Sequence, residues 1–303
     1  MKGRNQPFFC WASFYRPHQP YTPPRIYAER YDPSSITLPG SLREPSERLP
    51  PQLQAWRRSE AKPWCLALAA KDESLYRRYI GNYYALVSEI DHHVGAILDV
   101  LEQEGLADST IVVYTSDHGD FVGAHGMVEK CATGHNVYED TLGVPLIVRW
   151  PHRVRAGVVS EDLVESVDLY PTLLDLAGIK PPEGLPLPGR VLRPVLVEGR
   201  PLGREAAISE NRAQLTVVGL RYKLGVWLER QGDYPDMLFD RQRDPLEMKN
   251  LIGQPELARV EKQLRATIRA FVERTPSPPP AAVERHPGLS QPAAPPPARE
   301  AQP

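Results

Sequence analysis

An aspartate and a histidine stand side by side directly after a run of β-branched residues. Asp117 and His118 follow residues 110–115, whose sequence Thr-Ile-Val-Val-Tyr-Thr is typical of a buried strand. Ligands of open α/β sheets bind at the carboxyl ends of the strands. A carboxylate and an imidazole, on a turn relaxed by Gly119, offer two ligands to one divalent cation, so the pair is a candidate metal site. Aspartate favours hard cations, whereas histidine suits Mn²⁺, Zn²⁺ or Fe better than Ca²⁺. A solvated turn is the structural alternative.

A polar, glycine-rich loop follows this pair and carries a lysine. The ammonium of Lys130 could reach an anionic group held by the metal, although the commoner fate of a lysine is a place on the surface. His125 and His135 lie on the same loop. The residues alone leave open whether these two histidines are structural or functional.

Helices and strands alternate around these residues. Apolar residues at spacings of three, four or seven predict an amphipathic helix over residues 73–105, which Gly105 ends. Residues 144–150 read as a second buried strand, and 168–177 as a short helix that stops at Gly178. This order predicts an α/β fold with a mostly parallel sheet flanked by helices.

The pattern changes beyond residue 200, where short strands follow one another closely. These segments are residues 206–209, 215–220, 222–228 and 237–240. With an amphipathic helix over 255–273, they predict a small carboxyl-terminal antiparallel sheet plus helix subdomain. We therefore expect a truncated α/β domain over 1–200, this subdomain over 201–275, and a disordered Pro-rich tail over 276–303.

The amino-terminal part combines apolar and proline-rich stretches. Residues 8–15 are nearly all apolar or small, so we interpret them as a buried strand and not as a signal peptide. Residues 17–63 mix prolines with tyrosines and tryptophans. That mixture predicts an ordered, irregular loop packed over a core.

Composition excludes several classes of partner. The 303 residues carry a formal net charge of −2, so no broad attraction to nucleic acid or anionic lipid is expected. No apolar run approaches the length of a membrane span, so we expect no membrane partner. The three cysteines are widely spaced and suggest neither a disulfide framework nor a zinc knuckle. Their low number permits a cytoplasmic setting, which we favour, while localisation and oligomeric state stay open.

Several stretches, taken together, resemble the sulfatase family of the alkaline-phosphatase superfamily. They are residues 14–21, 84–106, 115–120, 123–126, 130, 138–140, 144–151, 168–178, 237–240, 244–245 and 250–251. The likeness runs from Pro7 to about Arg274 in the family's order. This breadth makes it more specific than the Asp-His pair alone.

The resemblance implies a metal-dependent hydrolase that acts on small-molecule sulfate esters. It assigns Asp117 and His118 as metal ligands, with Ca²⁺ expected first and Mn²⁺ or Zn²⁺ as alternatives. It assigns Lys130 and His18 as catalytic residues that contact the sulfate. The cation and Lys130 would neutralise charge on the transferring group. His18 would donate a proton or a hydrogen bond to the leaving oxygen.

The family's nucleophile has no counterpart in this sequence. It is a formylglycine made from Cys or Ser in a Cys/Ser-x-Pro-x-Arg motif, and neither a serine nor Cys10, Cys65 or Cys131 heads such a motif. The family's first strand, with a pair of Asp ligands at its end, is also missing. The resemblance therefore implies a carboxyl-terminal portion with a weak cation site, inactive unless an upstream part is supplied.

Three other readings compete with this one. A phosphonate or phosphate ester hydrolase of the same superfamily is compatible with the Asp-His pair, and the absent nucleophile segment would decide between the two. A non-catalytic remnant could use the 117–130 loop to bind anions or a partner. The tripeptide at residues 91–93, Asp-His-His, superficially suggests a DHH phosphoesterase, but it lies mid-helix without the aspartate-rich surroundings of those enzymes. We interpret His92 and His93 as helix-surface residues.

Overall fold

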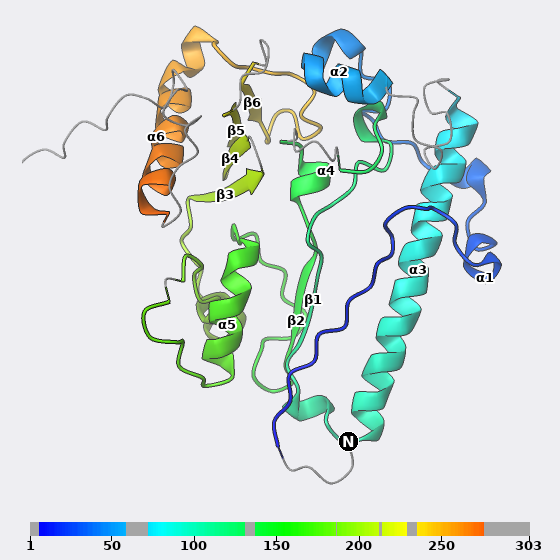
Figure 1. Ribbon diagram of the computed structural model, residues 1–303, viewed down its shortest axis with the longest axis vertical. Helices are drawn as coiled ribbons and strands as arrows, with labels where there is room; N and C mark the ends of the chain where they lie inside the picture. Colours follow the sequence, from blue (N-terminus) through cyan, green and yellow to red (C-terminus); the bar gives the residue numbers. More distant parts are fainter. Residues whose placement is uncertain are drawn as a thin grey trace, which may run out of the picture. The chain divides into compact units, whose positions relative to one another are not determined.

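A computed structural model (Figure 1) describes residues 6–58, 72–130, 137–185, 187–211, 214–228 and 235–275. The chain divides into two compact units. The first comprises residues 1–38 and 60–106, and the second comprises residues 39–59 and 107–303.

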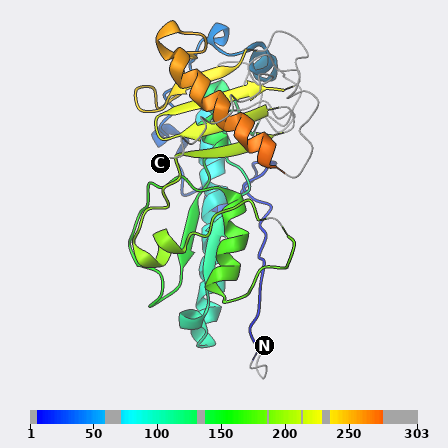
Figure 2. The same ribbon diagram turned by 90° about the vertical axis from the view of Figure 1, so that its left-hand side faces the viewer.

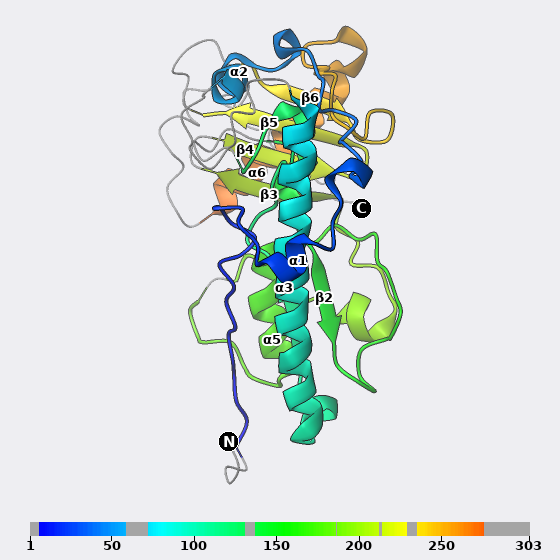
Figure 3. The same cartoon turned by 90° about the vertical axis from the view of Figure 1, so that its right-hand side faces the viewer.

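The first unit is organised around one long helix. Helix α3 spans Glu73–Gln103, with α1 (Arg25–Ala28) and the 3₁₀ turn η1 (Pro33–Ser35) packed against it (Figure 3). The side chain of Asp72 caps its amino end by accepting a hydrogen bond from the backbone N–H of Ser74. The predicted long helix is therefore confirmed.

The carboxyl end of α3 stops where the sequence predicts. Gly105 adopts a left-handed conformation with φ of 66°. The backbone N–H of Leu106 then donates to the carbonyl of Leu101 at 2.8 Å. This pattern satisfies one of the last carbonyls of the helix, which explains why a glycine stands there.

Residues 8–15 differ from their predicted structure. The segment is extended and runs beside α3 (Figure 3), but no described strand is hydrogen-bonded to it. Phe9 and Trp11 are each 77% exposed. The prediction of a buried strand is therefore wrong for the described chain, because apolar composition alone cannot supply a strand with a pairing partner.

The second unit contains a larger set of elements. Its helices are α2 (Pro51–Arg58), α4 (Glu139–Leu142), α5 (Leu169–Leu176) and α6 (Ala258–Arg274). Its strands are β1 (Val112–Thr115), β2 (Leu146–Arg149), β3 (Ala206–Asn211), β4 (Gln214–Gly219), β5 (Tyr222–Trp227) and β6 (Met237–Asp240).

Strands β1 and β2 form a two-stranded ribbon, with α5 on one side of it (Figure 2). They pair antiparallel, with Thr115 opposite Leu146 and Val112 opposite Arg149. The prediction of mostly parallel pairing is therefore corrected for the described strands. The connection over 116–145 leaves β1 and enters β2 at the same end of the ribbon, whereas parallel strands need a crossover to the opposite end.

The carboxyl-terminal sheet follows the prediction closely. Its strands are hydrogen-bonded in the order β3-β4-β5-β6, each antiparallel to the next. Helix α6 lies across one face of this sheet (Figure 2) and contacts β3, β4 and β5. The core between them includes Val217, Leu224, Val226, Leu238 and Ile268, each fully buried. The α/β class with this antiparallel sheet and helix is confirmed.

Some expectations concern residues outside the described chain. The Pro-rich tail over 276–303, Cys65, Cys131 and His135 all lie there. The boundary near residue 200 stays a prediction, although β3 begins shortly after it. Among the described helices, none is both long and apolar enough to cross a bilayer.

Candidate active site

The structure brings Asp117 and His118 together at the carboxyl end of β1. The Oδ1 atom of Asp117 accepts a hydrogen bond from the backbone N–H of His118 at 3.0 Å. Its Oδ2 atom lies 3.7 Å from Nε2 of His118, and the two side chains are 85% and 36% exposed. Two ligand atoms are therefore held within one short turn that is open to solvent.

A backbone contact determines which nitrogen of His118 can bind a metal. Nδ1 lies 2.8 Å from the carbonyl oxygen of Gly119. Because a carbonyl only accepts, Nδ1 must carry the proton, and the lone pair is left on Nε2. Nε2 faces the carboxylate of Asp117, and donors 3.7 Å apart can share one cation at bond lengths of about 2.0–2.5 Å. The pair fits a divalent cation.

This pair would supply only part of a metal's coordination shell. Across the residues that the structure describes, no group of three or more His, Cys, Asp or Glu side chains gathers to hold a metal ion. Asp117 and His118 therefore stand as a pair of candidate ligands among the described residues.

The loop after this pair is closed by its own backbone. The N–H of Phe121 donates to the carbonyl of Glu129, and the N–H of Gly123 donates to that of Met127, each at 2.9 Å. These bonds bring the end of the loop back towards its start. Lys130 directly follows Glu129 and is half-buried, so it stands where the closed loop returns.

Two glycines allow other segments to approach the loop closely. The N–H of Gly119 donates to the carbonyl of Thr141 at 2.9 Å. A Cβ atom at Gly119 would lie 2.1 Å from the backbone oxygen of Asp140. Gly126 has φ of +64°, and a Cβ there would lie 2.8 Å from Nε of Arg57. Any side chain at these positions would displace a neighbour.

A buried histidine occupies the tip of the loop. Nδ1 of His125 lies 2.6 Å from Oε2 of Glu44, and Nε2 lies 3.6 Å from Oδ2 of Asp140. The side chains of His125 and Glu44 are each 1% exposed. The backbone N–H of His125 also donates to Oγ of Ser41 at 3.1 Å. The sequence left the role of this histidine open, and the structure places it between two carboxylates.

The electrostatics around His125 favour a charged ring. Burial disfavours the imidazolium, but hydrogen bonding and charge from Asp140 and Glu44 outweigh it and raise the pKa of His125 above 6.5. Tyr138 packs against the ring with 4.1 Å between centroids. Burial and nearby carboxylates raise the pKa of Tyr138 well above 10, so its phenol stays neutral.

An apolar core lies beneath this polar loop. It joins α2, the loop, the start of α4 and strand β6. Its buried members are Leu49, Leu53, Phe121, Ala124, Met127, Val137, Tyr138, Met237 and Phe239. The loop is thus anchored by packing as well as by hydrogen bonds.

His18 belongs to the first compact unit and has its own local support. Its Nδ1 lies 3.0 Å from the carbonyl oxygen of Gln19, which leaves Nε2 for proton transfer. Its ring lies 4.6 Å from that of Tyr15, measured between centroids. The guanidinium of Arg16 donates to the carbonyl of Pro20 at 2.6 Å and so braces the turn.

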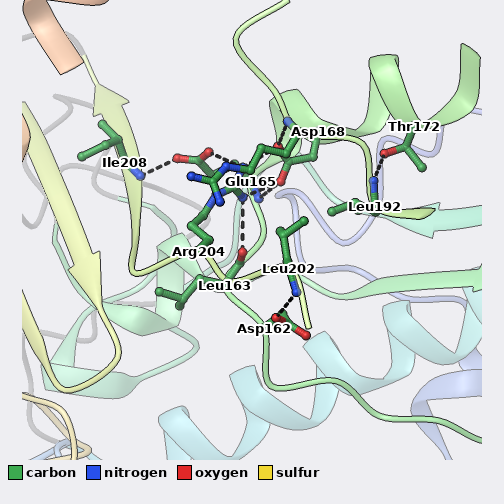
Figure 4. Close-up of polar contacts among 10 residues, drawn as sticks. Asp162, Leu163, Glu165, Asp168, Thr172, Leu192, Leu202, Arg204 and Ile208 are labelled. Carbon is green, nitrogen blue, oxygen red and sulfur yellow. Dashed lines mark hydrogen bonds and ion pairs between the residues drawn. The ribbon is translucent and has the colours of Figure 1, made fainter. Parts of the chain in front are cut away.

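A buried ion-pair network that sequence reasoning missed joins the start of α5 to β3 (Figure 4). Arg204 donates to both oxygens of Asp168, at 2.5 and 2.7 Å. Glu165 lies 3.0 Å from Arg204 and accepts a hydrogen bond from the N–H of Ile208 at 2.6 Å. Glu165 and Asp168 form a capping box, which the Glu-x-x-Asp spacing could have revealed, whereas Arg204 has no local sequence signal.

A second missed network ties α4 to the carboxyl-terminal sheet. Lys223 of β5 is fully buried, and its Nζ lies 2.8 Å from Glu139 and 2.7 Å from Glu247. Burial would raise the pKa of Glu139, but Lys223 and Arg241 outweigh it and lower that pKa. At Glu247 burial prevails and raises the pKa. The segment that holds the tip of the loop is therefore fixed to the sheet.

Comparisons with known proteins identify the family. A family model described as Sulfatase matches residues 1–179, and one described as N-sulphoglucosamine sulphohydrolase, C-terminal, matches residues 123–274. The chain is 36% identical over 199 residues to an N-acetylglucosamine-6-O-sulfatase of Bacteroides thetaiotaomicron, covering 62% of this chain and 35% of that protein. It is 28% identical over 265 residues to an arylsulfatase of Clostridium perfringens, covering 83% and 50%.

A similarity to a solved structure agrees with the sequence comparisons. A solved phosphonate monoester hydrolase from Silicibacter pomeroyi matches with a TM-score of 0.73 and 27% identity, over 87% of this chain and 55% of that one. The chain thus spans between about a third and about half of the length of these relatives. Because the Sulfatase model matches more than half of the sequence, the chain belongs to the sulfatase family of the alkaline-phosphatase superfamily.

Proposed function

We propose that this chain takes part in metal-dependent hydrolysis of sulfate monoesters. The observation that carries the proposal is the pairing of Asp117 Oδ2 with His118 Nε2 at 3.7 Å at the end of β1, in a chain of the sulfatase family. The cation expected is Ca²⁺, with Mn²⁺ or Zn²⁺ as alternatives. When bound, such an ion would act as a Lewis acid on a sulfate oxygen.

Two further residues would act on the ester. Lys130, at the return of the same loop, would hold a sulfate oxygen and stabilise the charge that develops there. His18, in its doubly protonated form, would donate the Nε2 proton to the departing alcohol oxygen, while its Nδ1–H stays hydrogen-bonded to the carbonyl of Gln19.

The covalent step would need a nucleophile that this sequence does not contain. No Cys or Ser heads a Cys/Ser-x-Pro-x-Arg motif. We therefore expect turnover only when a segment with that motif is joined to the chain. The chain alone would bind the cation and the anion without cleaving the ester.

The substrate class has one close competitor. The relative at 36% identity is an N-acetylglucosamine-6-O-sulfatase, which favours a sulfated small molecule as substrate. The solved relative at 27% identity is a phosphonate monoester hydrolase, which favours the alternative of a phosphonate or phosphate ester. A non-catalytic anion-binding remnant would bind sulfate and turn over neither ester.

The cation site is tested with Mn²⁺ as the probe, followed by electron paramagnetic resonance. We expect Asp117→Asn and His118→Gln each to weaken binding by about tenfold or more, since each removes one of two ligands. The matched control is the surface pair Asp108 and His152, whose atoms lie 4.0 Å apart. His152→Gln should leave binding unchanged. Equal binding by the Asp117→Asn, His118→Gln double variant would rule out the site.

The reaction is tested on a chain joined to a Cys-x-Pro-x-Arg segment whose Cys has been converted to formylglycine, with 4-nitrophenyl sulfate and 4-nitrophenyl phenylphosphonate as substrates. Faster turnover of the sulfate supports the proposal, faster turnover of the phosphonate supports its competitor, and none supports the remnant. Lys130→Ala should reduce turnover by about a hundredfold. Lys180→Ala, at an exposed lysine, is the control. Retained activity in Lys130→Ala would remove Lys130 from the site.

A further inference from the structure

We infer that His125 is a positioning residue for the candidate site. Its imidazole, clamped between Glu44 and Asp140, holds the loop over residues 117–130 in one conformation. This inference rests on the proposed function for the identity of the ligands at the loop, a divalent cation and a sulfate ester. The clamp itself is a property of the loop and can be measured without turnover.

Both ring nitrogens of His125 face a carboxylate. Nδ1 is 2.6 Å from Glu44, a hydrogen-bonding distance, and Nε2 is 3.6 Å from Asp140, which is an ion-pair distance. A neutral imidazole has one N–H and could serve only one of them. The imidazolium serves both, and the buried Glu44 carboxylate then keeps a charged partner. The raised pKa of His125 agrees with this protonation state.

Two other neighbours among the described residues, Arg57 and Tyr138, make different contacts. On the 39–58 segment, Nη1 of Arg57 donates to the backbone carbonyl of Glu44 at 2.5 Å. Beside α4, Tyr138 presents its ring face, and its phenol stays neutral. The clamp is therefore made by the two carboxylates.

The clamp is linked through α4 to the start of the loop as well as to its tip. The carboxylate of Asp140 faces His125 at the tip, while the backbone carbonyl of the same residue lies against Gly119. Gly119 directly follows His118 and donates its N–H to the next carbonyl of α4, that of Thr141. One turn of helix thus touches both the tip of the loop and the residue beside the candidate metal ligand.

The far side of the tip is held by another part of the chain. Ser41 accepts the backbone N–H of His125, and Glu44 accepts its ring N–H. The 39–58 segment and α4 are therefore joined through one imidazole. Loss of the ring's N–H groups should free the loop while leaving its apolar contacts in place.

The test uses the full chain and two variants. His125→Phe keeps an aromatic ring against Tyr138 but has no N–H, and Glu44→Gln keeps the shape but removes one charge. Side-chain ¹⁵N spectra report the protonation of His125, hydrogen exchange reports loop amides, and Mn²⁺ affinity reports the site. His152→Phe, at a surface histidine that faces a carboxylate, is the control.

The inference expects a doubly protonated His125 in the wild type at pH 6.5. It also expects amides 119–130 to exchange about tenfold faster in His125→Phe, the change produced by losing a charge-assisted hydrogen bond. Amides of β4 and β5 should be unchanged, and Mn²⁺ should bind more weakly. A singly protonated ring in the wild type, or unchanged loop exchange, would overturn the inference.

Two outcomes separate this inference from the proposed function. If the loop loosens but the wild type binds no Mn²⁺, the positioning role of the clamp stands and the metal site fails. If His125→Phe also speeds hydrogen exchange in the sheet, hydrogen exchange in the milder variant Glu44→Gln tests the clamp instead. Faster exchange confined to its loop amides supports the clamp, and unchanged exchange refutes it.

Discussion

The carboxyl-terminal sheet and the β1–β2 ribbon belong to the same compact unit but are stabilised differently. In β4 and β6 nearly every residue is buried, and α6 covers one face of that sheet. In β1 and β2 every residue is half-buried or exposed, and Ile147 is 61% exposed. The sheet rests on an apolar core, whereas the ribbon that leads to the candidate ligands has no fully buried residue.

This difference shows where stability and chemistry reside. The sheet buries apolar side chains, which stabilise at roughly 25 cal/mol per Å² of apolar surface. The loop has apolar contacts of its own, but it is also held by individual polar contacts, such as His125 with Glu44 and Gly119 with Thr141. We therefore expect changes in the sheet to affect global unfolding, and changes in the loop to affect local order.

The largest effect is expected at the buried ion pair that joins the start of α5 to the carboxyl-terminal sheet. Asp168→Asn removes one of the two carboxylate partners of Arg204, and the side chains of Asp168 and Arg204 are almost fully buried. Breaking a buried ion pair costs about 3–5 kcal/mol, and because Glu165 still lies 3.0 Å from Arg204 the free energy of unfolding should fall by an amount at the lower end of this range. Urea unfolding measures it.

Asp175→Asn, within the helix α5 that Asp168 precedes, is the matched control. Asp175 pairs with Arg193 at 2.7 Å, but these side chains are 34% and 38% exposed. We expect a loss of at most about 1 kcal/mol, because solvent screens the pair. Equal losses in the two variants would show that burial of the Asp168 pair adds nothing.

A core substitution compares the sheet and the ribbon directly. Leu224→Ala in β5 creates a cavity at a fully buried position, so it should cost about 2–5 kcal/mol. Ile147→Ala in β2 removes a largely exposed side chain and should cost less than about 0.5 kcal/mol. Urea unfolding of both variants tests the contrast. Similar losses would mean that the ribbon has a core of its own.

The smallest effect is a pH dependence that originates in the loop. Because the pKa of His125 is raised above 6.5, its stabilisation is fully present below that pH and is lost as the pH rises through the folded pKa. The urea midpoint should therefore fall as the pH rises above about 6.5. If the urea midpoint of His125→Phe falls by the same amount over the same pH range, the pH dependence originates in other groups.

Local patterns predicted the elements that need few distant partners. The stop of α3 at Gly105 and the four-strand meander followed from helix periodicity, glycine placement and short strand spacing. The proximity of Asp117 and His118 followed from their adjacency at the end of β1. Their roles, and those of Lys130 and His18, remain predictions.

Contacts between distant residues could not be predicted in this way. Glu44 and His125 are 81 positions apart, and nothing near Glu44 marks it as a partner of a histidine. The direction of β2 relative to β1 depends on where a long loop returns, which strand composition does not encode. Residues 8–15 have the composition of a strand without a described partner.

The long connection between β1 and β2 also has an entropic consequence. Strands β4 and β5 meet across a tight turn, whereas β1 meets β2 only after the chain closes over residues 116–145. Loop-closure entropy grows with the logarithm of length, so this pairing costs roughly 2 kcal/mol more than the tight turn. The short bonds that fold residues 119–130 back on themselves shorten the effective loop and offset part of that cost. The same contacts that shape the candidate site thereby help the ribbon to form.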